Sequence, residues 1–151
     1  MNKGNIIQLK SEDYKKCQDI WDMSKQPFPP KWYDELISGN RTIFVYQLNG
    51  EYIGEGALVF DTGDSHYIIP NQRIYLSWLI VKEDYRGQGI GGKIVDHLIE
   101  NAKQLGFNEL SLGVDCNNEV ARHLYTKKGF STILFQGVDE AGAYVKLLKE
   151  L

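Results

Sequence analysis

Apolar residues gather in three strand-like segments in the first half of this chain, with polar turns between them. The segments 41–48 and 51–60 are rich in β-branched and aromatic residues, and Asn49-Gly50 between them favours a tight hairpin turn. A third segment, 72–81, is the most apolar of the group. We therefore predict an antiparallel arrangement in this half, with 72–81 as the central strand of the sheet.

A helical period replaces this pattern later in the chain. Between residues 91 and 105, apolar side chains recur at spacings of three and four on one helix face, and Gly106 suits the end of that helix. Ser11 is expected to cap an earlier helix that runs towards Trp21. The proline-rich segment 26–30 is expected to be a loop, followed by a short helix over 31–37.

Four further strands and one further helix complete the expected order. The helix is expected to begin at Asn117 or Asn118, either of which suits an N-cap, and to end at Gly129. The strands are expected at 5–9, 109–114, 131–136 and 143–148. This order predicts a mixed α/β fold, and 151 residues suit a single domain over residues 1–151.

Composition and charge argue against several classes of function. The formal net charge is −3, with lysine and arginine spread along the chain, so we expect no nucleic-acid partner. Cys17 and Cys116 are the only cysteines, which fits the reducing cytoplasm and predicts neither a disulfide framework nor a zinc site. The histidines, His66, His97 and His123, are scattered, so no metal is expected. No apolar run is long enough to span a membrane, which predicts a cytoplasmic protein.

The most informative motif is a glycine-rich run directly before the long amphipathic helix. Alternating glycines at a helix N-terminus leave backbone N–H groups free, and the helix dipole favours negative charge there. The run is therefore expected to bind a phosphate group. Its residues are Arg86, Gly87, Gln88, Gly89, Ile90, Gly91 and Gly92.

Two nucleotide motifs match this run in part. A nucleoside-triphosphate loop would need a serine or threonine as the Mg²⁺ ligand where this chain has Ile94. A dinucleotide fingerprint fits the glycines, and Asp115 lies about where a ribose-binding acid is expected. In that fingerprint, however, the strand leads directly into the first glycine, whereas five residues follow Val81 here.

The run resembles the Arg/Gln-x-x-Gly-x-Gly/Ala loop of the GCN5-related N-acetyltransferase (GNAT) family. Arg86, Gly89 and Gly91 occupy its fixed positions, after a strand that ends in Leu79-Ile80-Val81. A second segment resembles the family's Asn-x-x-x-Ala-x-x-Leu-Tyr-x-x-x-Gly-Phe signature. It is carried by Asn117, Ala121, Leu124, Tyr125, Gly129 and Phe130. The two motifs occur in the family's order and at its separation.

This resemblance implies a GNAT-type fold with a mixed, mostly antiparallel sheet of six to seven strands and about four helices. It also implies transfer of acetyl from acetyl-CoA to a primary amine by direct attack in a ternary complex, without a metal. The pyrophosphate would lie on the glycine loop, and the pantetheine arm beside Leu79, Ile80 and Val81. Tyr125 would be the general acid and Asn117 a pantetheine contact. The acceptor could be a small molecule or a peptide, and a homodimer is possible.

The general base is not fixed by these motifs. Some family members carry a glutamate where this chain has Tyr75, and Ser77 shares its strand face. Glu55, expected on a face with Ile53, Ala57 and Val59, is an alternative base whose pKa burial would raise. A water chain would also serve.

The acceptor pocket is expected to involve Phe28, Trp32 and Tyr33 together with the loop 61–66. Aromatic residues in a proline-rich segment can equally belong to the core. A different class also remains open at this point: a non-catalytic acyl-CoA-binding sensor or interaction module of the same fold. Retention of Tyr125 favours the enzyme, whereas the tyrosine at position 75 favours the module.

Overall fold

Seven strands form one mixed sheet in the computed structural model, which describes residues 4–151. The order across the sheet is β1-β2-β3-β4-β5-β7-β6, and only the β4–β5 pair is parallel. The strands are β1 (Asn5–Gln8), β2 (Arg41–Leu48), β3 (Glu51–Val59), β4 (Arg73–Val81), β5 (Glu109–Asp115), β6 (Thr132–Asp139) and β7 (Gly142–Glu150). The fold class expected from the sequence is confirmed, and β4 is the central strand as predicted.

The β2–β3 hairpin shows how local chemistry fixes the first half of the sheet. Asn49 and Gly50 have φ values of 53° and 79°, the left-handed conformation that a two-residue hairpin turn requires. Asparagine and glycine adopt this conformation at low cost, so the predicted turn is confirmed.

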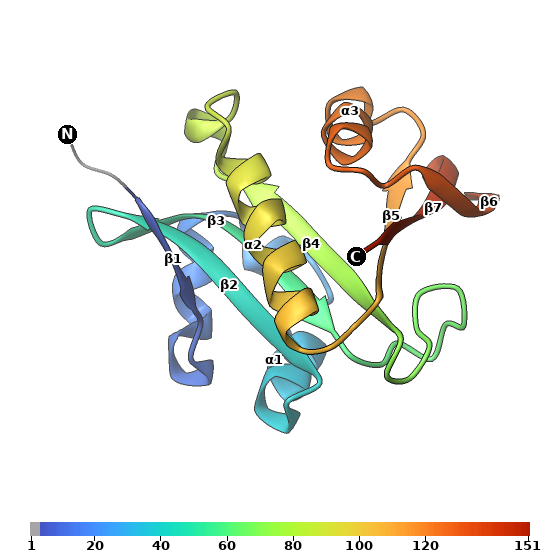
Figure 1. Ribbon diagram of the computed structural model, residues 1–151. Coiled ribbons are helices and arrows are strands. Elements are labelled where there is room, and N and C mark those ends of the chain that lie inside the picture. Colours follow the sequence, from blue (N-terminus) through green and yellow to red (C-terminus); the bar gives the residue numbers. More distant parts are fainter. Residues whose placement is uncertain (1–3) are drawn as a thin grey trace.

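The long helix α2 (Ile90–Gln104) covers one face of the sheet (Figure 1). Its buried side chains include Ile94 and Leu98, as the apolar spacing predicted. Gly54 and Gly56 of β3 allow the helix to approach closely, because a Cβ at either position would lie 2.9 Å from one of these side chains. Larger residues at either glycine would therefore push α2 away from the sheet.

The opposite face is covered by η1 (Ser11–Asp19), η2 (Met23–Lys25) and α1 (Pro29–Ser38) (Figure 1). The prediction that Ser11 caps an α-helix is wrong. The segment is a 3₁₀-helix whose N-cap is Lys10, without a side-chain cap. The buried residues Tyr14, Cys17 and Ile20 explain this, because a spacing of three matches three residues per turn.

Two helix starts also differ from expectation. α1 begins at Pro29 rather than after the prolines, because proline suits the first turn, where its missing N–H would be unpaired anyway. α3 (Glu119–Lys127) is capped by Asn118, whose side chain accepts a hydrogen bond from the N–H of Ala121 at 3.2 Å. Across residues 4–151, no helix is long and apolar enough to cross a membrane.

Candidate active site

The two central parallel strands separate part-way along the sheet. β4 pairs with β5 only over Arg73 to Tyr75, opposite Glu109 to Ser111. Beyond that point β4 continues beside β3, and β5 continues beside β7. Within residues 4–151, the edge of β4 over 77–81 therefore has no strand partner on its β5 side. Such an edge offers backbone donors and acceptors to an extended ligand.

A β-bulge reshapes β4 where it has lost this partner. The register with β3 shifts between Ser77 and Ile80, so that Trp78 and Leu79 together oppose one residue. Trp78 has a φ of 54°, a strained value for a bulky side chain. Trp78 consequently packs on the α1 side of the sheet and Leu79 on the α2 side. Nothing in the alternation of the sequence indicated this bulge.

The glycine run forms the turn that leads from η3 (Glu83–Tyr85) into α2. Gly87 and Gly89 have φ values of 79° and 81°, which favour glycine. Gly89 is the N-cap of α2, and no side chain caps the helix. Within the described chain, the backbone N–H groups of residues 87–92 donate no hydrogen bond. This row of donors at the positive end of the helix dipole can bind a phosphate.

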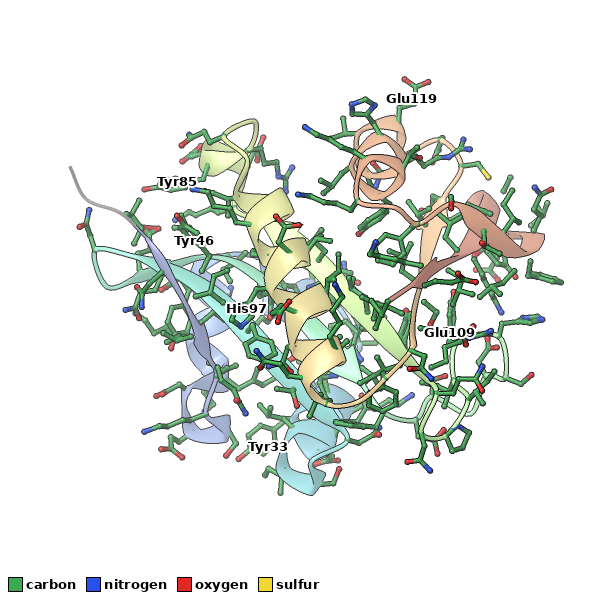
Figure 2. The ribbon with its side chains drawn as sticks, in the orientation of Figure 1. Tyr33, Tyr46, Tyr85, His97, Glu109 and Glu119 are labelled. Carbon is green, nitrogen blue, oxygen red and sulfur yellow. The ribbon has the colours of Figure 1, made fainter. Side chains whose placement is uncertain are left out.

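The other side chains of the run point away from this row of donors. The Nε of Arg86 donates to the carbonyl of Val81 at 2.8 Å, so this side chain fixes the turn after β4. Gln88 and Ile90 face a hollow of about 630 Å³ on the side of α2 towards β1 and β2. Figure 2 labels three other residues that line it: Tyr46, Tyr85 and His97.

Tyr125 lies on α3, the helix that follows β5. Its side chain is buried, with 7% exposure, and its ring packs edge-on against Phe130. Burial raises the pKa of the phenol, and the nearby Tyr75 raises it further. The hydroxyl therefore stays protonated at neutral pH and can act as a proton donor.

The sequence left Asn117 and Asn118 open as the N-cap of α3. The structure selects Asn118, so Asn117 does not cap the helix. Asn117 is exposed, and its backbone carbonyl accepts from the N–H of Glu119 at 3.1 Å. Its amide side chain has no hydrogen-bond partner among residues 4–151, which leaves it available to a ligand.

Glu55 is a buried carboxyl group on the α1 side of β3, with 3% exposure. It shares this side with Ala57 but not with Ile53, which packs on the α2 side because the β2–β3 register also shifts. The indole N–H of Trp21 donates to its carboxylate. Burial raises the pKa of Glu55 to about 7, although hydrogen bonds from Trp21 and Cys17 oppose the shift. A carboxyl group with this pKa can accept a proton near neutral pH.

Replacing Glu55 by glutamine is expected to flatten the pH dependence of stability. The unfolded carboxyl titrates near 4.5 and the folded one near 7. Between these pH values the unfolded chain releases a proton that the folded chain keeps, so the free energy of unfolding falls as the pH rises. At about 1.4 kcal/mol per unit of pKa, the wild type loses about 3 kcal/mol more than Glu55→Gln over this range. Urea denaturation at several pH values measures the difference.

Glu100→Gln is the control for this measurement, because Glu100 is exposed on α2. Its pH profile should follow that of the wild type. Identical profiles for the wild type and Glu55→Gln would contradict a raised pKa at Glu55.

The aromatic residues expected around the acceptor divide into two groups. The rings of Phe28 and Trp32 stack at 4.8 Å, and both contact the bulge residue Trp78, at 5.6 and 5.4 Å between centroids. Tyr33 instead stacks on Tyr14 at 6.2 Å and is 39% exposed. Phe28 and Trp32 therefore lie beside the bulge, whereas Tyr33 does not join them.

The loop expected to face the acceptor lies on the other side of β4. Lys146 of β7 donates to Asp64 at 2.7 Å, and its Nζ lies 3.1 Å from Nδ1 of His66. The next loop residue, Tyr67, stacks on Tyr75 at 4.3 Å. The loop and the Phe28–Trp32 pair thus flank the α1 side of β4 from opposite directions. Sequence reasoning missed Tyr67 and the bulge residue Trp78.

The chain matches known proteins in sequence and in fold. A model of the Acetyltransferase (GNAT) family matches residues 6–130. A thialysine N-epsilon-acetyltransferase of Bos taurus is 32% identical over 136 residues, which cover 83% of this chain and 76% of that protein.

Solved structures share the fold at lower identity. A ribosomal-protein-alanine N-acetyltransferase from Brucella melitensis has a TM-score of 0.77 at 17% identity, covering 97% of this chain and 99% of that chain. A structure from Salmonella typhimurium that contains acetyl-CoA has a TM-score of 0.72 at 18% identity, covering 99% and 94%.

Proposed function

The chain belongs to the acetyltransferase (GNAT) family and is an acyltransferase, and we propose that it transfers the acetyl group of acetyl-CoA to a primary amine. The row of unpartnered N–H groups over residues 87–92, next to the separated edge of β4, carries this proposal. A phosphate site at one end and an open strand edge at the other suit a ligand with a pyrophosphate and an extended amide arm.

The binding roles follow from the two ends of this site. The N–H groups from Gly87 to Gly92, at the start of α2, would hold the pyrophosphate. The backbone of Leu79 to Val81 would pair with the pantetheine arm, and Asn117 would contact that arm from the side of α3. The coenzyme supplies the acetyl thioester. An N–H donor at the bulge, that of Leu79, would polarise the thioester carbonyl, a contribution of about 3 kcal/mol for a well-aimed donor.

Two side chains move protons in this proposal. Glu55, with its pKa near 7, accepts the proton that the amine must lose before it attacks directly in a ternary complex. Trp21 donates a hydrogen bond to Glu55 and packs on Trp78 at 5.0 Å, so both rings lie close to the carboxyl group. Because Glu55 is buried, the proton would reach it through a water chain. Tyr125 donates a proton to the departing thiolate, and its buried phenol is in the protonated form that this role needs.

The proposal describes one domain over residues 1–151 that acts in the cytoplasm. Cys17 and Cys116 are both free thiols, as suits a reducing compartment. The acceptor is a small-molecule or peptide amine, and its selection depends on the α1 side of β4 rather than on the glycine loop.

Acetyl-CoA is expected to raise the melting temperature, whereas NAD and ATP are not. At 100 times its Kd, a ligand that binds only the folded state adds about 2.7 kcal/mol, or about 5–10 °C for a domain of this size. Thermal denaturation with each compound at equal concentration measures the shift. Stabilisation by NAD or ATP but not by acetyl-CoA would overturn the proposal.

A further inference from the structure

Arg41 is a buried cation beside the bulge in β4. It begins β2, and its side chain is 4% exposed. Its Nε donates to Glu35 at 3.3 Å and its Nη1 donates to the hydroxyl of Ser77 at 3.2 Å. The guanidinium lies over the ring of Trp32, 4.3 Å from its centroid. These contacts fix the plane of the guanidinium on the α1 side of the sheet.

The partners of Arg41 leave part of its hydrogen-bonding capacity unused. A guanidinium carries five N–H donors, and among residues 4–151 only the Nε and Nη1 of Arg41 have a partner. Burial also lowers the pKa of Arg41, although the adjacent Glu35 opposes this shift. One carboxylate therefore does not fully compensate the cost of burying the guanidinium charge. A second carboxylate would use the free donors in the geometry that guanidinium prefers.

Arg41 lies close to the segment of β4 that the proposed reaction uses. Its Nη1 is hydrogen-bonded to Ser77, which precedes Leu79 by two residues at the bulge. Glu55 lies beyond the bulge, opposite Ile80. A cation and a carboxyl group thus flank Ser77 and Trp78 on the same side of the sheet. This pair of groups is complementary to a zwitterion, whose carboxylate would lie at Arg41 and whose amine would lie towards Glu55.

We infer that Arg41 binds the carboxylate of the acceptor, and that the acceptor is a free amino acid. The inference rests on the proposed acetyl transfer and narrows its substrate class. Arg41 is thus a specificity residue of the acceptor site. Trp32 and Ser77 hold its guanidinium in place, so that little conformational freedom is lost when the carboxylate binds.

Matched pairs of amino acids and their decarboxylated amines test this assignment. Lysine and cadaverine, phenylalanine and phenethylamine, and alanine and ethylamine each differ only by the carboxylate. CoA release from acetyl-CoA measures the rate. In a productive pair, kcat/KM is expected to be about 30-fold higher for the amino acid than for the amine, the effect of one hydrogen bond to a charged group. Arg41→Gln should reduce this ratio to near one, and Arg41→Lys should restore part of it.

Arg73→Gln is the matched control, because Arg73 forms a similar partly buried pair with Glu109 at 3.1 Å. Its ratio should equal that of the wild type, even if the protein is less stable. The ratio of the kcat/KM values for two substrates does not depend on the fraction of folded enzyme. A purely structural role of Arg41 would therefore leave this ratio unchanged.

The outcomes separate this inference from the proposed function. Equal rates for amines and amino acids in the wild type, or an unchanged ratio in Arg41→Gln, would overturn the inference and leave acetyl transfer intact. If acetyl-CoA stabilises the protein but none of the pairs gives CoA release, the inference alone would also be overturned. No release and no stabilisation by acetyl-CoA would overturn both.

Discussion

Tyr125→Phe is expected to lower kcat about 100-fold, the lower end of the range for loss of a general acid. The phenol is buried on α3, and the ring of phenylalanine would keep its packing against Phe130. No hydrogen bond from the Tyr125 hydroxyl occurs within residues 4–151, so its removal should cost little stability. The KM for acetyl-CoA should change much less than kcat, because only proton donation to the thiolate is lost. Steady-state thiol release measures both constants.

Tyr46→Phe is the matched control for this substitution. Tyr46 is also buried, with 8% exposure, but it lies on β2 in the hollow on the opposite side of α2 (Figure 2). Its loss of a hydroxyl should leave kcat within about twofold of the wild type. A Tyr125→Phe enzyme with wild-type kcat would exclude Tyr125 as the proton donor.

Gly91→Leu is expected to weaken acetyl-CoA binding by about 100-fold, or about 2.7 kcal/mol. A Cβ at position 91 would lie 3.6 Å from Leu124 and 3.8 Å from Val81, between α3 and the end of β4. The rest of a leucine side chain would extend into the gap that the coenzyme is proposed to enter. Leucine also favours helix over glycine, so the fold should persist. Titration with acetyl-CoA, by calorimetry or thermal shift, measures the loss.

Gly91→Ala separates the effect of bulk from the loss of glycine. Its Cβ would make only ordinary van der Waals contacts, so this variant should bind acetyl-CoA within a few fold of the wild type. Equal weakening in both variants would point to helix geometry rather than to a blocked gap. Unchanged binding in Gly91→Leu would show that the coenzyme does not pass this position.

The parts of the site that were predicted depend on local chemistry. The glycine run requires left-handed φ values and free N–H groups at a helix start, and both are readable from residue types. The structure shows Gly87 and Gly89 in this conformation and α2 directly after them. The burial of Glu55 was likewise suggested by its apolar neighbours, although a register shift places Ile53 on the other face.

The parts that were not predicted depend on contacts between distant segments. Ser11 was expected to cap an α-helix, but burial of every third residue selects a 3₁₀-helix. The φ of 54° at Trp78 is strained, and no residue-type preference indicates it. Arg41 has no motif around it, and its role is inferred only because Glu35 and Ser77 converge on it from α1 and β4.

Two motifs in the sequence indicated the family by resemblance. The sequence by itself also determined the order of strands and helices and the glycine-rich turn before α2, because turns, caps and apolar periods act over a few residues. Only the tertiary structure decided where β4 separates from β5, where the bulge lies, and which charges flank it. These features depend on register between strands and on packing from both faces of the sheet, which no local pattern encodes. The coenzyme end of the proposed site is therefore readable from the chain, whereas the acceptor end required the fold.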